Sequence, residues 1–286
     1  MTSPMVIDTV EALRKTVATW RAAGERISYV PTMGALHQGH LSLVRLARKQ
    51  ARRVIVSIFV NPTQFAAHED LGAYPRTFDA DLGLLADVQA DAVFFPAAAE
   101  MYPPGFASAI SLAGPAAVGL EDSFRPGHFS GVATVVAKLL LQGQPDLAIF
   151  GEKDYQQLCV IRRVVRDLNI PVEILGGPTV RAPSGLALSS RNAYMTPRER
   201  DVIAPKIHLA LTDCAAALRA GGLIDASLAK ASHTLEMAGF ELDYLDLRDA
   251  DSLARPNGNA CDPKQMYRLL VAARLPRVRL IDNIAV

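Results

Sequence analysis

The chain is poor in cysteine, in net charge and in long apolar runs. Its three cysteines, Cys159, Cys214 and Cys261, are too few and too widely spaced for a disulfide framework or a zinc finger. Lysine and arginine number 30 against 29 aspartates and glutamates, and this net charge of +1 argues against a nucleic-acid-binding surface. No apolar run approaches the roughly 18 residues of a membrane span, and Met1-Thr2-Ser3-Pro4 lacks the basic and apolar regions of a signal peptide. We therefore expect a cytoplasmic protein that binds neither nucleic acid nor a membrane.

The composition is that of an ordinary globular protein, with 286 residues of which 50% are apolar and 21% are charged. This length corresponds to about two domains. In the first part of the chain, short β-rich runs alternate with amphipathic helical segments. The expected strands are 27–30, 54–60, 92–95, 147–150 and 172–175, and the expected helices begin near Thr9, His40, Thr77, Gly131 and Leu158. The alternation predicts an α/β fold: a Rossmann-like, doubly wound parallel sheet that binds ligands beyond the carboxyl ends of its strands.

The pattern changes near Gly176-Gly177-Pro178, which favours a hinge there. Downstream, Thr196-Pro-Arg-Glu199 is a capping box with proline at the first helical position. The elements expected after it are a long helix to Arg219, a helix over 225–237 and strands over 240–247, 267–272 and 278–284. We predict two domains, residues 1–178 and a smaller α+β domain of residues 179–286.

The most informative string is Val30-Pro-Thr-Met-Gly-Ala-Leu-His-Gln-Gly-His40, in which two histidines flank Gly39 where a helix begins after a strand. Free N–H groups at a helix N-terminus attract anions. Gly39 leaves room for a phosphate, and His37 and His40 can donate hydrogen bonds to it. The composition, with 6 histidines and 19 glycines, predicts only about 0.008 chance matches to His-x-Gly-His. The alternatives are two surface histidines that cap a helix, or a zinc site, although no carboxylate or cysteine nearby completes a ligand set.

Polar residues also follow two other expected strands. Lys153 in Gly151-Glu-Lys-Asp154 is a mobile charge suited to phosphate, whereas Asp154-x-x-Gln157 is explained equally well as a capping box. Asn61 and Gln64 offer uncharged donors and acceptors for hydroxyls and a carboxylate, but Asn-Pro is also common turn chemistry.

Two further strings carry arginine. Ser189-Ser190-Arg191-Asn192 combines two hydroxyls with a guanidinium, which suits a phosphate clamp, although such a string is more often an ordinary polar loop. Arg125 in Arg125-Pro-Gly-His128 can reach a substrate carboxylate or form a structural salt bridge, and a histidine such as His128 more often caps or packs than catalyses.

Together these strings resemble a known family. His-x-Gly-His after a strand resembles the nucleotidyltransferase superfamily, which includes class I aminoacyl-tRNA synthetases, and the wider string 31–44 resembles pantothenate synthetases (pantoate–β-alanine ligases). Agreement with that family extends, in order, through the strings 60–65, 125–129, 151–157, 188–192 and 279–283. Pro276-Arg-Val278 departs from its pattern. The resemblance runs nearly end to end.

The resemblance implies specific residue roles. The catalytic residues would be His40, His37, Lys153 and Arg191. The ATP-binding residues would be Met33, Gly34, His37, Gly39, His40, Gly151, Lys153, Asp154, Val180, Leu188, Ser189, Ser190 and Arg191. The residues that bind pantoate or β-alanine would be Met33, Asn61, Gln64, Arg125 and Gln157. Mg²⁺ would bridge the phosphates of ATP, with Asp81 on the magnesium or β-alanine side, although Ala80 stands where some family members carry a second acid.

The implied reaction has two steps in one cavity. The pantoate carboxylate attacks the α-phosphorus of ATP, giving pantoyl adenylate and pyrophosphate, and the amine of β-alanine then attacks the acyl carbon, giving pantothenate and AMP. The second domain would close as a lid because the adenylate hydrolyses in water, and the family implies a homodimer. Two alternatives stay open: a nucleotidyltransferase that releases its nucleotidylated product, and a non-catalytic nucleotide-binding module.

Overall fold

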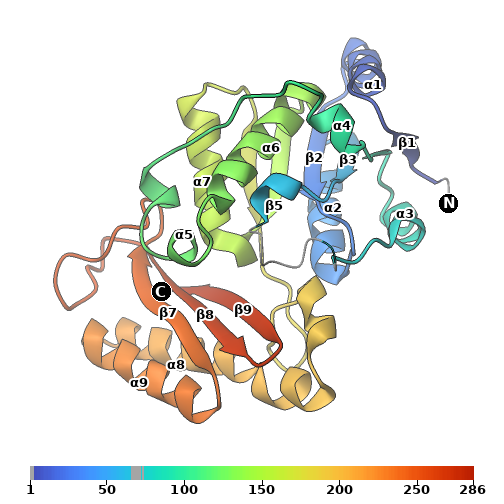
Figure 1. Cartoon of the computed structure of the whole chain (residues 1–286). Helices are drawn as coiled ribbons and strands as arrows, with labels where there is room; N and C mark the ends of the chain where they lie inside the picture. Colours follow the sequence, from blue (N-terminus) through green and yellow to red (C-terminus); the bar gives the residue numbers. More distant parts are fainter. Residues whose placement is uncertain (1–2, 66–71, 73) are drawn as a thin grey trace.

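Two sheets organise the chain in the computed structural model, which describes residues 3–65, 72 and 74–286 (Figure 1). The strands are β1 (Met5–Ile7), β2 (Ile27–Thr32), β3 (Arg53–Ile58), β4 (Ala92–Phe94), β5 (Leu147–Gly151), β6 (Glu173–Gly177), β7 (Glu241–Asp249), β8 (Tyr267–Leu275) and β9 (Val278–Ala285). The α-helices are α1 (Val10–Ala22), α2 (Gln38–Gln50), α3 (Phe78–Asp87), α4 (Ala98–Met101), α5 (Glu121–Phe124), α6 (His128–Gly143), α7 (Tyr155–Asp167), α8 (Lys206–Arg219) and α9 (Ile224–Met237).

The first sheet is parallel throughout and has the strand order β1-β4-β3-β2-β5-β6. Its strands are almost continuously apolar because helices cover both faces. Helices α1, α6 and α7 pack with Tyr29 and Phe94 on one face, and α2 and α3 pack with Val30 and Val56 on the other. The predicted fold class, a doubly wound parallel sheet with a smaller α+β part, is confirmed.

The direction of winding reverses between β2 and β5. From β2 the chain continues through β3 and β4 toward one edge of the sheet, whereas from β5 it continues to β6 toward the other edge. The loops that leave the carboxyl ends of β2 and β5 therefore diverge, and ligands of doubly wound sheets bind in the crevice between such loops. The His-x-Gly-His string follows β2 and the Lys153 string follows β5, so the topology brings them together.

The second sheet is antiparallel, in the order β7-β8-β9, and α8 and α9 cover one of its faces (Figure 1). Leu211 of α8 and Leu235 of α9 are fully buried against Leu269 and Val271 of β8 in a core of their own. The chain passes from one sheet to the other after β6 ends at Gly177.

The long helix expected after Thr196 is interrupted, so that prediction is wrong. The capping box itself forms, with the Glu199 N–H donating to Thr196 Oγ1 at 3.2 Å and the Thr196 N–H donating to Glu199 Oε2 at 2.7 Å. A π-helical turn then spans Glu199–Ile203, and α8 begins only at Lys206. The cause is Pro205, which has no N–H to donate and crowds the carbonyl four residues earlier.

The other differences from the predicted elements are small. The sequence does not predict β1, α4 or α5, because elements of three or four residues show no measurable periodicity. Strand β3 ends at Ile58 rather than residue 60, and α6 begins at His128 rather than Gly131. The three cysteines are unpaired thiols, as expected. None of the described helices combines the length and apolar character that a bilayer crossing requires.

Gly131 tests how closely α6 approaches the 3-10 turn η1 (Pro62–Gln64) after β3. A Cβ atom at Gly131 would lie 2.4 Å from the carbonyl oxygen of Thr63, so Gly131→Ala forces the helix and the turn apart. We expect the free energy of unfolding to fall by about 1–3 kcal/mol, the usual effect of overpacking.

Gly83→Ala in α3 is the matched control for this variant. A Cβ atom at Gly83 meets nothing within 4 Å, and alanine is the better helix former, so the free energy of unfolding should rise by about 0.5–1 kcal/mol. Urea denaturation compares the two variants, and equal stabilities would contradict the close packing of α6.

Candidate active site

A cavity of about 230 Å³ opens where the loops after β2 and β5 diverge. The predicted site residues that line it are Met33, His37, Gly39, His40, Asn61, Gln64, Gly151, Lys153, Asp154, Gln157, Val180, Leu188, Ser189, Ser190 and Arg191. Gly34, Asp81 and Arg125 are not part of this lining. The structure therefore brings most of the predicted site into one place.

The two histidines occupy the first turn of α2. His37 is the N-cap residue, and its Nδ1 accepts a hydrogen bond from the Gly39 N–H at 3.1 Å. The Nδ1 of His40 accepts from the His37 N–H at 3.3 Å, and the two ring centroids are 4.1 Å apart. The histidines thus do cap a helix, and the same residues line the cavity, so the structural and the functional interpretations are compatible.

These hydrogen bonds fix the tautomer of both rings. An Nδ1 that accepts from a backbone N–H carries no proton, so each neutral ring is protonated on Nε2. In the part of the chain that the structure describes, neither Nε2 has a hydrogen-bond partner. Each ring therefore keeps one N–H donor for a ligand in the cavity.

Burial keeps both rings neutral. It lowers the pKa of His37 to about 4, and the positive charge of Lys153 acts in the same direction. Burial lowers the pKa of His40 to about 3, helped by the neighbouring His37 ring. An anion bound next to them would favour the charged forms and raise both pKa values.

Gly39 is required by the ring of His37. A Cβ atom at Gly39 would lie 2.8 Å from Cε1 of His37. Any side chain at this position would displace the ring from its hydrogen bond. The spacing His-x-Gly-His therefore has a packing cause in addition to the open approach that it leaves for phosphate.

Asp81 holds the turn between β2 and α2. It is only 2% exposed, and its carboxylate accepts hydrogen bonds from the N–H groups of Ala35 and Leu36 at 2.9 and 2.8 Å. Gly34 and Ala35 have φ values of 83° and 50°, a left-handed backbone conformation that is strained for Ala35 and needs such support. Asp81 thus acts on the site through the shape of this turn, and both of its oxygens are engaged there.

Asn61 and Gln64 shape the cavity after β3. Asn61 is 1% exposed, with Oδ1 accepting from the Tyr102 hydroxyl at 2.7 Å and Nδ2 donating to the Gly131 carbonyl oxygen at 3.2 Å. Gln64 accepts from Asn61 at 3.1 Å and donates to the sulfur of Met33 at 3.2 Å. Asn61 therefore braces the loop, and the Gln64 amide is oriented toward the cavity wall with hydrogen-bonding capacity left for a ligand.

His128 links Arg125 to this loop. Its Nδ1 is 2.9 Å from the carbonyl oxygen of Gln64, and its Nε2 is 3.0 Å from Nη1 of Arg125. A carbonyl oxygen can only accept, so Nδ1 donates and Nε2 accepts from the guanidinium. His128 is buried and packs, which is the role that the sequence favours for it.

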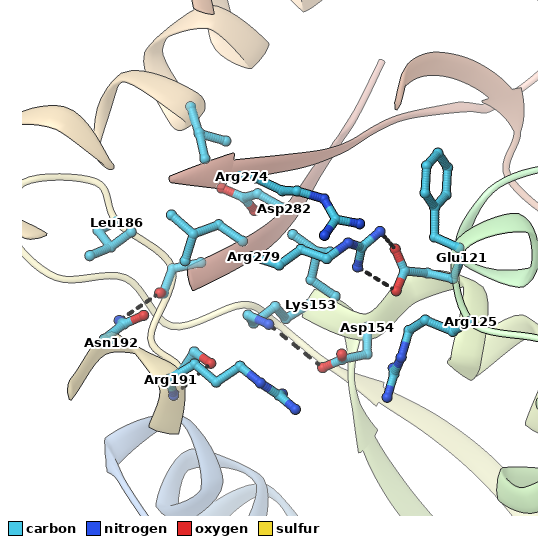
Figure 2. A pocket seen from close by; sticks show the side chains of 16 residues that line it. Glu121, Arg125, Lys153, Asp154, Leu186, Arg191, Asn192, Arg274, Arg279 and Asp282 are labelled. Carbon is cyan, nitrogen blue, oxygen red and sulfur yellow. Dashed lines mark hydrogen bonds and ion pairs between the residues drawn. The ribbon is translucent and has the colours of Figure 1, made fainter. Parts of the chain in front are cut away.

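A second cavity of about 230 Å³ lies between this site and strands β8 and β9 (Figure 2). On its wall Arg279 of β9 makes a bidentate contact with Glu121 of α5, at 2.6 and 2.8 Å, and Arg125 also lines it. The residues that it shares with the first cavity are Lys153, Asp154, Ser189 and Arg191. The cations Lys153 and Arg191 therefore lie where the two cavities meet, and the joined cavities leave room for a chain of phosphates.

The alternative capping role of Asp154 is not realised. Asp154 precedes α7 but its side chain makes no capping hydrogen bond. Instead, the carboxylate lies 4.0 Å from Nζ of Lys153, as the dashed line in Figure 2 shows. The two side chains face the cavities together.

Local hydrogen bonds hold the segment that carries Arg191. The Leu188 N–H donates to the Val180 carbonyl oxygen at 2.9 Å, and Ser189 Oγ accepts from the Arg191 N–H at 3.3 Å at the start of a 3-10 turn. This fixes the backbone next to the Lys153 turn.

Sequence reasoning missed the apolar wall of the cavity and one hydroxyl group. Val132, Val135, Val136 and Leu139 of α6 line the cavity. The available signal was a helix with apolar residues on all sides, which predicts that its whole surface is buried. Thr179 Oγ1 is buried in the lining and has no hydrogen-bond partner among the described residues. Such an unpaired hydroxyl suits a ligand contact.

Known proteins are similar to this chain over nearly its whole length. A family model described as pantoate-beta-alanine ligase matches residues 5–285. The chain belongs to this family. It is 53% identical over 283 residues to the pantothenate synthetase of Rhodopseudomonas palustris strain HaA2, with 99% of each chain covered. It is also 53% identical over 291 residues to the pantothenate synthetase of Caulobacter vibrioides, with 100% of each chain covered.

Solved structures of pantoate–β-alanine ligases share the fold. The pantothenate synthetase from Thermus thermophilus superposes with a TM-score of 0.90 at 44% identity, covering 98% of each chain. The ligase from Francisella tularensis, complexed with beta-gamma ATP and β-alanine, has a TM-score of 0.82 at 36% identity, covering 99% of this chain and 97% of that one. The family resemblance that the sequence strings carry is confirmed.

Histidine NMR tests which ring nitrogens of the site carry protons. In the ligand-free protein at pH 7, His37 and His40 should both be the neutral Nε2–H tautomer, with pKa values of about 4 and 3 that rise when ATP binds. Unfolded histidines take up protons near pH 6.5, so the folded state loses stability as the pH falls from about 6.5 toward 4. An imidazolium at pH 7 without ligand, or an Nδ1–H tautomer, would contradict the geometry.

Proposed function

We propose that this chain catalyses the ATP-dependent ligation of pantoate and β-alanine to pantothenate through a pantoyl adenylate, releasing AMP and pyrophosphate. The observation that carries the proposal is the pair of Nε2–H donors of His37 and His40, at a helix N-terminus and beside Lys153 and Arg191. The pantoate carboxylate attacks the α-phosphorus and pyrophosphate leaves. The amine of β-alanine then attacks the acyl carbon, AMP leaves, and the new amide nitrogen loses a proton to the medium.

The phosphates of ATP are bound by the histidine turn and the shared cations. The Nε2–H groups of His37 and His40 donate to oxygens between the α- and β-phosphates, where charge develops as pyrophosphate leaves. Phosphate binding raises their pKa values, and we assign the donation of a proton to His40. Lys153 and Arg191 neutralise the charge of the β- and γ-phosphates. The other residues of the ATP site contribute uncharged groups or, for Asp154, a carboxylate: Met33, Gly34, Gly39, Gly151, Asp154, Val180, Leu188, Ser189 and Ser190.

Pantoate occupies the part of the cavity beside α6. Its carboxylate and hydroxyls hydrogen-bond to the amides of Gln64 and Gln157, and Asn61 fixes the loop that carries Gln64. The two methyl groups of pantoate face the apolar wall of α6. Met33 closes this end of the cavity, and Arg125 serves the carboxylate of β-alanine from the second cavity.

Mg²⁺ would be held mainly by the phosphates of bound ATP and would supply positive charge beside them. This ion prefers octahedral oxygen ligands and keeps several waters, so the protein need supply few. The described residues contain no cluster of three or more histidine, cysteine, aspartate or glutamate side chains that would hold a metal. Asp81 would act on such an ion only indirectly, because its carboxylate holds the turn between β2 and α2.

Residues 179–286 form a second domain, which turns about a hinge near Pro178 and closes over the nucleotide. Closure excludes the water that would hydrolyse the adenylate. The protein acts in the cytoplasm as a homodimer built through the larger domain.

AMP formation with each substrate omitted in turn tests the reaction. We expect sustained AMP release only with ATP, pantoate and β-alanine together. Pantoate carrying ¹⁸O in its carboxylate should transfer one label to AMP, because the attacking oxygen stays on phosphorus. Continuous release of a nucleotidylated acid without β-alanine would identify a nucleotidyltransferase, and ATP binding with no AMP formed would identify a non-catalytic module.

His40→Ala should slow pantoate-dependent ATP–pyrophosphate exchange by about 10²–10³-fold, the usual effect of removing a donor to developing negative charge. His40→Asn is the matched variant, because its amide oxygen can still accept from the His37 N–H and keep the cap, while the Nε2 donor is lost. Both variants should be slow. Near-normal exchange in His40→Asn would assign the histidine to capping alone.

A further inference from the structure

Two adjacent residues near the end of β9, in the second sheet, hold the two segments that we propose to bind phosphate. These segments are the Lys153 turn and the Ser189–Arg191 segment. The first of the two residues to consider is Asn283, which is 3% exposed. Its Nδ2 donates to the carbonyl oxygens of Glu152 and Lys153, at 2.9 and 2.8 Å. One amide group of the second sheet thus holds the backbone of the turn that carries the Lys153 ammonium.

Arg268 of β8 fixes the orientation of this amide. Its Nε donates to Asn283 Oδ1 at 2.6 Å, so the oxygen cannot exchange places with the nitrogen without losing three hydrogen bonds. Nη2 of Arg268 also donates to Glu152 Oε2 at 3.2 Å, and its guanidinium lies 4.2 Å from the ring centroid of Tyr155. The hold on the Lys153 turn is therefore rigid.

The second residue, Asp282, holds the other segment. Its carboxylate accepts both ends of the Arg181 guanidinium, at 2.6 and 2.9 Å, and it is 5% exposed. Arg181 also donates to the Gly185 carbonyl oxygen at 3.1 Å and bridges to Ala187 in a short antiparallel pair. This hairpin leads directly into Ser189-Ser190-Arg191. Figure 2 shows Asp282, Lys153 and Arg191 lining the same cavity.

We propose that the Asp282-Asn283 pair is a positioning element that sets the spacing between Lys153 and the Ser189–Arg191 segment, and so determines how well the protein holds the β- and γ-phosphates. Consecutive residues of a strand point to opposite faces, so one dipeptide can hold two segments at a fixed separation. The inference rests on the proposed function, because it takes those two segments to bind the triphosphate. It assigns to β9 a role in nucleotide binding rather than in amide formation.

Comparing the binding of ATP and AMP isolates this role. Asn283→Asp keeps the shape and the acceptor for Arg268 but replaces both N–H donors by an anionic oxygen that repels the two carbonyls. Titration calorimetry of the full-length protein without pantoate should show ATP binding weakened about tenfold or more. This is the effect of losing one hydrogen bond between the displaced Lys153 ammonium and a phosphate. AMP has no β- or γ-phosphate, so its affinity should change by less than about threefold.

Arg181→Lys is the second variant and acts on the contact between Asp282 and the hairpin that leads into Ser189–Arg191. It keeps the charge but loses the bidentate contact with Asp282, and it should weaken ATP binding in the same selective way. Tyr244→Phe is the matched control, since it removes a different contact made by the second sheet, the 2.9 Å hydrogen bond from the Tyr244 hydroxyl of β7 to Glu121. Tyr244 lines a small cavity together with Lys153 and Asp154, but its hydroxyl hydrogen-bonds to Glu121 and not to their backbone. The ATP and AMP affinities of Tyr244→Phe should therefore both stay within about twofold of the wild type.

The outcomes separate this inference from the proposed function. Equal loss of ATP and AMP binding, with a matching fall in Tm, would reduce Asp282 and Asn283 to structural residues and overturn the inference. Unchanged ATP binding in Asn283→Asp and Arg181→Lys would overturn it as well, with the ligase activity of the wild type unaffected. A wild-type protein that binds no ATP would overturn the proposed function, and the inference with it.

Discussion

The site depends on two hydrogen bonds, from the backbone N–H groups of Gly39 and His37 to the Nδ1 atoms of His37 and His40. They satisfy donors that the start of a helix leaves open, and they fix Nε2 as the protonated nitrogen of each ring. Burial then keeps the rings neutral, because it lowers both pKa values far below 7. At neutral pH the protein thus presents two uncharged, oriented donors, and an anion bound beside them would raise their pKa values. Gly39 and Asp81 keep this arrangement in place, one by giving space to a ring and the other by holding the strained turn before it.

The topology places this local arrangement beside the other polar residues of the candidate site. Because β2 and β5 are neighbours at the point where the winding reverses, the histidine turn faces the Lys153 turn across one crevice. The same α6 helix that covers the sheet supplies the apolar wall, and the second sheet reaches the crevice through β9. The neutral donors of His37 and His40 and the cations Lys153 and Arg191 line one cavity, and such a set suits the formation of an acyl adenylate, in which charge moves toward the departing pyrophosphate.

The sequence predicts most of what is local. Strand–helix alternation predicts the sheet, and His-x-Gly-His after a strand predicts the start of a helix with both histidines in its first turn, because both patterns report backbone geometry directly. It does not predict contacts that depend on distant packing. The Asp81 carboxylate meets the Ala35 N–H across 46 residues, and no local pattern indicates that this acid supports a turn. Similarly, Arg125 lines the neighbouring cavity, and His128 links it to the Gln64 loop across 64 residues. The break before α8 is a different case, since Pro205 is visible in the sequence and its effect follows from its missing N–H.

A crystal structure with pantoate and a non-hydrolysable ATP analogue tests the central claim most directly. We expect phosphate oxygens at about 3 Å from Nε2 of both His37 and His40, with the pantoate carboxylate in line with the α-phosphorus and the far phosphates between Lys153 and Arg191. Phosphates bound elsewhere, or a histidine pair that contacts the carboxylate or only water, would contradict it.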